Sequence, residues 1–255
     1  MTHPPSRGRL PPLIAHRGNA ADFPENTLEA LQSAVDLGLK HVEFDVQLTA
    51  DSTPVVLHDS DLKRVAGRPL CVHDLTAAAL AGIPITEPQR FGDRFEHVRA
   101  PTLARVVEAL AQWHDVTGFV EVKRASLRRF GHQAVLERIA AEVAPALDHC
   151  VLISFDLASV HQLRAMAGAR VGWVIEHYDE PTRRLATEAR VDYLFADLEC
   201  IPATTTELWP GGWQWAIYEI RDTATARRCA GLGARLVETM NVRDMLDAYA
   251  RADAP

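Results

Sequence analysis

Acidic and apolar residues alternate along His41–Leu48, a pattern typical of a β-strand. The alternation places Glu43, Asp45 and Gln47 on one face and apolar side chains on the other. Two carboxylates about 6–7 Å apart on one strand face repel each other unless a cation or a proton lies between them. Oxygen ligands favour hard ions such as Mg2+ or Ca2+. We therefore predict a divalent-cation site here; the alternative is a half-solvated strand whose acidic face meets water.

A histidine is expected beside these carboxylates. A second apolar run, Pro54–Leu57, follows so soon that a parallel crossover does not fit, and the two runs must form a hairpin. With the turn at residues 51–52, which are of turn-forming types, the pairing places His58 opposite Phe44 or Asp45.

Two further segments carry charged or titratable residues at the ends of expected strands. Glu121 and Lys123 fall on one face of another alternating run, which adds a third carboxylate and a positive charge. His16 and Arg17 end the short apolar run Leu13–Ala15, and polar groups at a strand end suggest a functional loop. A histidine exchanges protons near neutral pH, so His16 is a candidate for proton transfer.

The composition describes a globular protein and argues against several classes. The chain has 255 residues, a hydrophobic fraction of 47%, a charged fraction of 24% and a net charge of −7. No basic run is present, so binding to nucleic acid is not indicated. The N-terminus lacks the apolar core of a secretory signal, and the four cysteines show no CxxC spacing. We expect one domain over residues 1–255, no membrane span, and a cytoplasmic location with reduced cysteines.

Apolar runs alternate with helical patterns along the chain, and this order predicts a parallel sheet. Strands are expected at Leu13–Ala15, His41–Leu48, Pro54–Leu57, Gly118–Lys123, Val151–Ser154, Val171–Ile175, Tyr193–Phe195, Trp215–Tyr218 and Leu236–Glu238. With the hairpin counted as one position, eight strands predict a (β/α)8 TIM barrel, whose chemistry lies at the carboxyl ends of its strands. The segment 60–100 is too long for a simple connection between strands, and its length predicts a lid or a small insertion. A doubly wound sheet is the alternative, but the chain has no glycine-rich phosphate loop.

An ordered set of motifs resembles the glycerophosphodiester phosphodiesterase family. The motifs are His16–Gly18, Pro24–Thr27, Glu43–Asp45, Pro54–Asp59 and Glu121–Lys123. The resemblance implies a TIM barrel with one divalent cation, either Mg2+ or Ca2+, and a pair of histidines acting as general acid and base. The residues that it assigns to these roles are Glu43, Asp45 and Glu121 for the cation and His16 and His58 for proton transfer.

The resemblance further implies hydrolysis of a small glycerophosphodiester to an alcohol and sn-glycerol 3-phosphate. A phosphodiester repels nucleophiles and has a poor leaving group, so its hydrolysis needs cations near the phosphate and a proton donor. Arg17 would bind the phosphate, and Lys123 would add a positive charge or merely neutralise Glu121. Trp215 is expected either in the core or as a pocket wall against the glycerol carbons. Glu25 is expected at a helix start, or in support of the site.

The second half of the chain departs from the family pattern. Family members tend to have Trp-Thr-Val-Asn in a late strand and Thr-Asp near the last one, where this chain has Trp215–Glu219 and Val237–Thr239. The replacements, which include Tyr218, Glu219 and Glu238, bear on substrate choice. Two alternatives stay open: a lipid phosphodiesterase of the phospholipase C or sphingomyelinase D type, and a non-catalytic metabolite-binding barrel.

Overall fold

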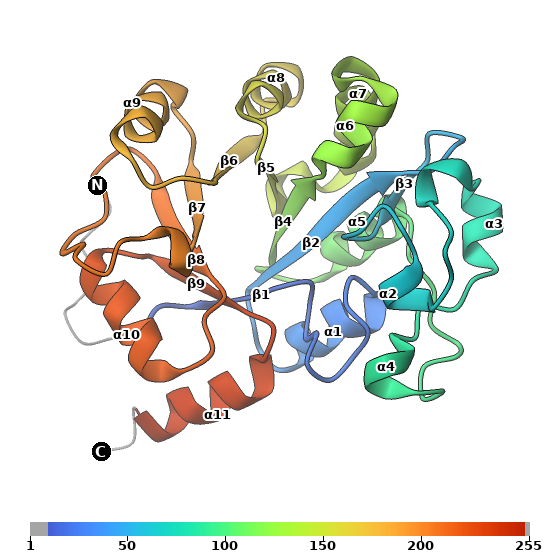
Figure 1. The fold of residues 1–255 in the computed structure, drawn as a ribbon, viewed down its shortest axis with the longest axis horizontal. Helices are drawn as coiled ribbons and strands as arrows, with labels where there is room; N and C mark the ends of the chain where they lie inside the picture. The colour runs from blue at the N-terminus through green and yellow to red at the C-terminus, as the bar shows by residue number, and fades with distance from the viewer. Residues whose placement is uncertain (1–9, 253–255) are drawn as a thin grey trace.

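Eight parallel strands close into a barrel in the computed structural model, which describes residues 10–252 (Figure 1). The barrel strands are β1 (Leu13–Ala15), β2 (His41–Leu48), β4 (Thr117–Val122), β5 (Cys150–Ser154), β6 (Arg170–Ile175), β7 (Tyr193–Asp197), β8 (Gln214–Tyr218) and β9 (Leu236–Thr239). The ring closes because β1 pairs with both β2 and β9. The TIM-barrel prediction is confirmed, whereas the N-terminal segment predicted to lack a secretory signal lies almost entirely outside the described residues.

The predicted hairpin is present and lies outside the barrel ring. Strand β3 (Pro54–Val56) runs antiparallel to the carboxyl end of β2, with Val46 opposite Val56. The Leu57 N–H continues the ladder by donating to the Asp45 carbonyl at 2.9 Å. This register places His58 opposite Phe44, as the sequence pattern predicts.

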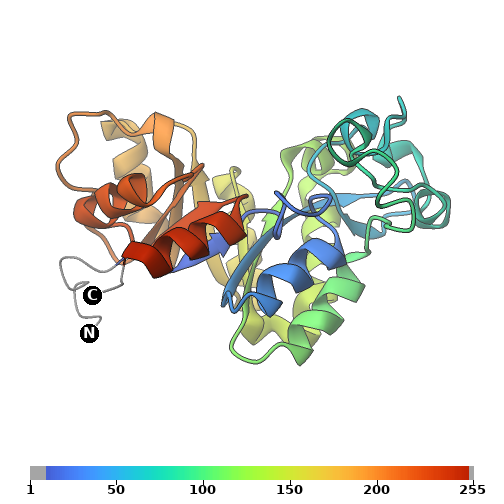
Figure 2. The ribbon, with the colours of Figure 1, turned by 90° about the horizontal axis from the view of Figure 1, so that it is seen from below.

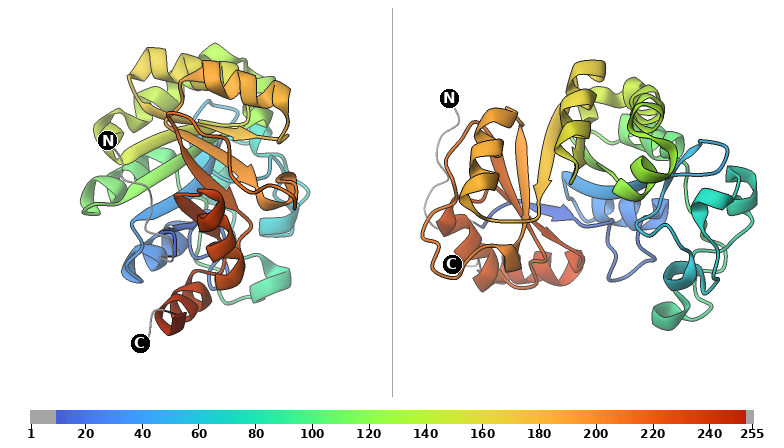
Figure 3. Two further views of the ribbon diagram at one scale, coloured as in Figure 1. Left: turned by 90° about the vertical axis from the view of Figure 1, so that its left-hand side faces the viewer. Right: turned by 45° about the horizontal axis from the view of Figure 1, so that its top comes forward.

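Helices cover the outside of the barrel (Figure 3). They are α1 (Leu28–Asp36), α5 (Leu103–Gln112), α6 (Arg124–Phe130), α7 (His132–Val143), α8 (Leu157–Ala167), α9 (Glu180–Ala189), α10 (Thr223–Leu232) and α11 (Val242–Ala252), with short 3-10 turns η2 (Ala144–His149) and η3 (Leu198–Cys200). Threonine caps begin two of them, since Thr27 accepts from the Ala30 N–H and Thr102 from the Arg105 N–H. No helix among residues 10–252 is long and apolar enough to cross a membrane.

Residues 60–100 form the predicted insertion. It contains α2 (Lys63–Ala66), η1 (Val72–Asp74), α3 (Ala77–Ala81) and α4 (Pro88–Phe91). It lies at the end of the molecule opposite α10 (Figure 2). A small core of its own, which includes Leu62, Leu80 and Ile85, packs against Val55 and Leu57 of the hairpin arm. The insertion therefore stands beside the arm that carries His58.

Strand alternation divides the buried side chains into two layers. One layer fills the barrel interior and consists of Ile14, Phe119, Val151, Ile153, Val174, Tyr193, Phe195, Ala216 and Leu236. The other lies between strands and helices and includes Val42, Phe44 and Val46 from β2. Because successive strand residues face opposite ways, Glu43 and Asp45 point into the barrel.

Gly18 is the glycine on which the loop after β1 depends. Its φ is +81°, and an added Cβ would lie 2.6 Å from the Ala30 carbonyl carbon. Gly38, at the end of α1, also has a positive φ, +92°, but an added Cβ there meets nothing within 4 Å.

We expect Gly38→Ala to lower the free energy of unfolding by about 1–2 kcal/mol, the cost of left-handed backbone. Gly18→Ala should cost roughly 1–3 kcal/mol more, because the clash adds to that strain. Urea unfolding of both variants measures this, and equal losses would contradict it.

Candidate active site

Four carboxylates gather inside the carboxyl end of the barrel. Glu43 and Asp45 come from β2, Glu121 from β4 and Glu238 from β9, and each is at most 9% exposed. Asp45 and Glu121 are paired residues of neighbouring strands. One oxygen from each of Glu43, Asp45 and Glu121 lies within 4.8 Å of the others, so the structure brings the predicted trio together.

Two cations lie among these carboxylates. The Lys123 ammonium is 2.8 Å from Glu121 and 3.1 Å from Asp45, and the Arg17 Nε is 3.4 Å from Asp45. Burial by itself raises the pKa of Asp45, but Lys123 and then Arg17 lower that pKa well below its usual range. Burial likewise favours neutral Lys123, yet the two carboxylates raise its pKa above the ordinary value.

Glu43 and Glu238 form no ion pair with the side chains of Arg17 and Lys123, which pair with Glu25, Asp45 and Glu121. With all four acidic groups ionised, the cluster would carry −4 against +2 from Arg17 and Lys123, an excess of two negative charges that protons or a cation must balance. Glu43 Oε1 and Glu238 Oε1 are buried and accept no hydrogen bond. Burial, followed by repulsion from the neighbouring carboxylates, raises the pKa of both groups well above the usual value. An all-oxygen donor set with an excess charge of −2 fits a divalent cation of the Mg2+ or Ca2+ kind.

The loop after β1 holds the carboxylates of β2 in place. The Arg17 N–H donates to Glu43 Oε2 at 3.0 Å. The Asn26 side chain donates to Asp45 Oδ2 at 2.8 Å and accepts from the Asp45 N–H at 3.0 Å. Both loop residues have a positive φ, +55° for Arg17 and +58° for Asn26. Asn26, which the sequence predicts to order the loop at a helix start or to support the site, therefore orients Asp45 directly.

His16 lies against this cluster with its two nitrogens facing different carboxylates. Its Nε2 is 3.9 Å from Glu43 Oε2, and its Nδ1 is 3.8 Å from Glu219 Oε1. Burial, then the charge of Arg17, lowers the pKa of His16 to about 4. The imidazole is therefore neutral at pH 7 and can accept a proton.

His58 is held by a chain of ion pairs. Its Nδ1 is 2.7 Å from Asp59 Oδ1, and Arg64 Nε donates to Asp59 Oδ2 at 2.8 Å. Arg64 also donates to Glu25 Oε1 at 2.7 Å, and the Arg17 guanidinium donates to the same oxygen at 3.0 Å. Arg64, from the insertion, thus connects the two arms of the site. No pattern in the sequence points to Arg64, because Glu25 and Arg64 are far apart along the chain and meet only in the folded protein.

Trp215 lies away from the carboxylates. Its side chain packs in the layer between barrel and helices, and its Nε1 donates to the Trp209 carbonyl at 2.9 Å. It also lines a pocket of about 530 Å³ together with Arg170, which begins β6, so the pocket lies toward the amino ends of the strands. Alternation along β8 turns Tyr218 inward instead, with its ring centroid 6.4 Å from that of His16. Of the predicted site residues, Trp215 is the one that the structure does not bring to the cluster.

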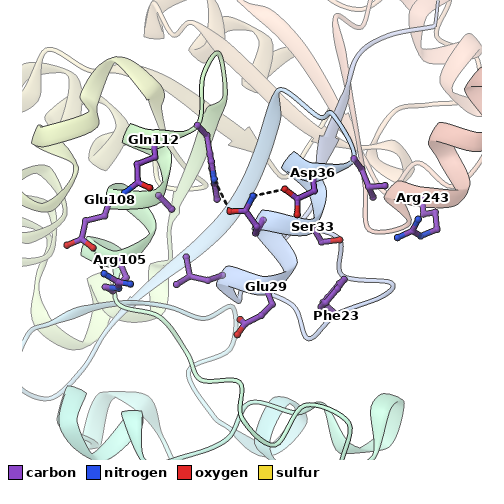
Figure 4. A pocket seen from close by; sticks show the side chains of 13 residues that line it. Phe23, Glu29, Ser33, Asp36, Arg105, Glu108, Gln112 and Arg243 are labelled. Carbon is purple, nitrogen blue, oxygen red and sulfur yellow. Dashed lines mark hydrogen bonds and ion pairs between the residues drawn. The ribbon is translucent and has the colours of Figure 1, made fainter.

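A separate groove of about 700 Å³ lies on the outside of the molecule between α1 and α5 (Figure 4). Glu29, Asp36 and Arg105 are among its lining residues, and none of the clustered carboxylates is. The Trp113 indole donates to Gln32 across it at 3.0 Å. The groove is therefore distinct from the candidate active site.

The fold is shared with solved structures of phosphodiesterases. A putative glycerophosphoryl diester phosphodiesterase from Silicibacter pomeroyi DSS-3 superposes with a TM-score of 0.81 at 21% identity, over 96% of this chain and 93% of that chain. An Oleispira antarctica phosphodiesterase, solved in complex with its product sn-glycerol-3-phosphate, superposes with a TM-score of 0.79 at 22% identity, over 94% and 97%. Likeness at these identities shows the fold, a closed parallel barrel, and not the function.

The model of the glycerophosphoryl diester phosphodiesterase family matches residues 16–204, and the chain belongs to that family. Glycerophosphodiester phosphodiesterase 1 of Mus musculus is 33% identical over 158 residues, which are 59% of this chain and 44% of the relative. A glycerophosphodiester phosphodiesterase of Caldanaerobacter subterraneus subsp. tengcongensis is 32% identical over 159 residues, 61% of this chain and 62% of the relative. The chain therefore matches about half of the length of these relatives.

The uncompensated Glu238 generates a prediction about stability. Its pKa is raised in the folded state, so its favourable contribution is present below the unfolded pKa and is lost as pH rises through the folded pKa. In metal-free buffer, Glu238→Gln should therefore be more stable than the unaltered protein at pH 8, by about 1–3 kcal/mol, because the amide removes the buried charge and an unsatisfied buried group costs more when it is charged. The difference should shrink at pH 5. Urea unfolding after exhaustive chelation measures it, and a destabilised variant at pH 8 would show that Glu238 has a favourable partner.

Proposed function

We propose that the protein is a metal-dependent phosphodiesterase that hydrolyses glycerophosphodiesters to an alcohol and sn-glycerol 3-phosphate. The observation that carries the proposal is the convergence of an oxygen-only carboxylate trio with His16 and Arg17 inside one end of the barrel. Family membership and the product named for the Oleispira antarctica structure support the choice of substrate. We further infer a single domain and a cytoplasmic location, which suits four free cysteines.

Glu43, Asp45 and Glu121 are the residues proposed to hold the cation. When bound, a divalent cation supplies positive charge beside the non-bridging phosphate oxygens as negative charge develops on them. Asn26 and the Arg17 N–H fix the orientation of Asp45 and Glu43, so the ligand oxygens need little rearrangement.

His16 and His58 are proposed to share the proton transfers. Neutral His16 is suited to accept a proton from the attacking hydroxyl, because burial and Arg17 hold its pKa low. Burial lowers the pKa of the free His58 ring, and the carboxylates of Asp45 and of Asp59, which lies against Nδ1, oppose that shift by stabilising the protonated form. A phosphate anion bound nearby favours the same protonated form, which suits His58 to protonate the leaving oxygen.

Arg17 and Lys123 are proposed to bind the phosphate. The Arg17 guanidinium has five N–H donors. One of its hydrogen bonds goes to Glu25, which leaves donors for phosphate oxygens. Lys123 carries a point charge at the cluster, and its pairing with Asp45 and Glu121 keeps it protonated. The two cations are positioned before substrate binds, which reduces the reorganisation needed in the transition state.

The proposal is tested with defined diesters. We expect comparable turnover of glycerophosphocholine and glycerophosphoethanolamine in Mg2+ or Ca2+, with sn-glycerol 3-phosphate as the measured product, and little hydrolysis of bis(p-nitrophenyl) phosphate. Chelation should abolish turnover, and restored cation should recover it, because the carboxylates repel substrate when no cation is bound. Full activity after exhaustive chelation would remove the cation from the mechanism. Preference for an intact two-chain phospholipid would favour the lipid phosphodiesterase alternative.

A mutant cycle tests the histidine pair. His16→Ala and His58→Ala should each lower kcat by roughly 10²–10⁴-fold, the range for a positioned acid or base. The double variant should lose about as much as the worse single one, because residues acting as a unit are strongly non-additive. The acid limb of the kcat/KM profile should lie below the ordinary histidine pKa of 6.5, since His16 stays neutral down to about pH 4, and His16→Ala should lose that limb. Fully multiplicative losses would separate the two residues into different steps.

A further inference from the structure

Glu238 is the carboxylate of the cluster that the proposed mechanism does not use. It is 3% exposed, and its Oε1 has no hydrogen-bond partner. The charges that bear on it most are those of Glu121 and Asp45, which repel it. Arg17 and Lys123 form their ion pairs in the cluster with Asp45 on β2 and Glu121 on β4, and not with Glu238 on β9. A carboxylate so placed must take up a proton or bind a cation from outside the protein.

Glu238 belongs to a second group of potential ligands. One atom from each of His16, Glu43 and Glu238 lies within 4.8 Å of the other two. This group shares Glu43 with the trio already described, and Glu43 is the single member common to both. Glu43 has two carboxylate oxygens, and its Oε1 is buried without a hydrogen bond. It is therefore able to place one oxygen toward each group, as bridging carboxylates do in two-metal sites.

The orientation of His16 suits metal binding. Nε2 faces Glu43, and Nδ1 faces Glu219 on the other side of the ring. Metal-binding histidines usually donate their second ring N–H to a carboxylate, which fixes the tautomer and strengthens the ligand. Glu219, which follows β8 with a φ of +64°, lies 3.8 Å from Nδ1, longer than a hydrogen bond, and would take that supporting position by moving closer.

We propose that a second divalent cation binds between His16, Glu43 and Glu238, adjacent to the first and bridged to it by Glu43. The donors are one imidazole nitrogen and two carboxylate oxygens, a set that suits Mn2+, Fe2+ or Zn2+ better than Mg2+, which prefers oxygen alone. Paired metals in phosphodiester sites are about 3.5–4 Å apart, a separation that one bridging carboxylate spans.

The effect of the second cation on activity rests on the proposed function, because that cation would bind the histidine proposed to accept a proton. A cation bound to Nε2 takes the lone pair with which His16 would accept a proton. Mg2+ would fill the first position and leave His16 free. A transition metal that also fills the second position would inhibit hydrolysis. The activity would therefore depend on which metal is present and on its concentration.

Manganese provides a readout that does not depend on turnover. Equilibrium dialysis of the metal-free protein against Mn2+ should give two ions per chain, with an EPR spectrum broadened by coupling between neighbouring ions. Glu238→Gln should retain one ion with an uncoupled six-line spectrum and should weaken the second by at least about tenfold, as loss of a supporting group already does. Glu199→Gln is the matched control, since it removes the same charge from an exposed residue near the barrel mouth, and it should bind two coupled ions.

The outcomes separate this inference from the proposed function. One Mn2+ per chain, two uncoupled ions, or unchanged coupling in Glu238→Gln would overturn the second site, whatever the activity. Hydrolysis of glycerophosphocholine in Mg2+ should fall as Mn2+ fills the second position in the unaltered protein. Two coupled ions with undiminished turnover would retain the site and remove His16 from proton transfer. No turnover in any metal would overturn the proposed function and leave the binding result standing.

Discussion

The site depends on an excess of buried negative charge. Four carboxylates share one end of the barrel with two cations, and none of the four is more than 9% exposed. Burying charge without compensation is among the most costly arrangements in a protein, so such a cluster persists only with protons or metal ions to balance it. The barrel supplies the rigid strands that hold like charges close together, and this unfavourable arrangement is the reason for proposing a cation site there.

The inserted subregion completes the site from the outside. Arg64 lies in α2, yet it pairs with Asp59 behind His58 and with Glu25 behind Arg17. Glu87, also from the insertion, accepts from the Glu25 N–H at 2.6 Å. These contacts tie the loop after β1 to the hairpin arm. A connection that looks like a long excursion in sequence thus fixes two functional arms relative to each other, in keeping with the placement of functional loops on barrel scaffolds.

The residues that the sequence analysis interprets as departures from the family pattern lie on the last two strands and directly after β8. Tyr218 and Glu238 both point into the barrel, and Glu219 faces His16. These side chains lie around His16 at the ends of β8 and β9. The second half of the chain therefore sets the environment of this histidine. Trp215, the conspicuous aromatic of that half, serves the outer packing layer instead.

Local patterns in the sequence determined the strands, the hairpin and the faces of the acidic residues. The period of two along β2 assigned Glu43 and Asp45 to one face, and the short gap to Pro54 required the pairing that returns His58 to their level. The same alternation, applied to β8, separates inward Tyr218 from outward Trp215, but choosing the inner face required knowing which way the barrel closes. Only the tertiary structure decided that Glu238 of the last strand meets Glu43 of the second, because ring closure through β1 brings together residues far apart in sequence. The ion pairs of Arg64 depend in the same way on how an insertion docks, which is set by packing between distant segments and leaves no periodic signal in the chain.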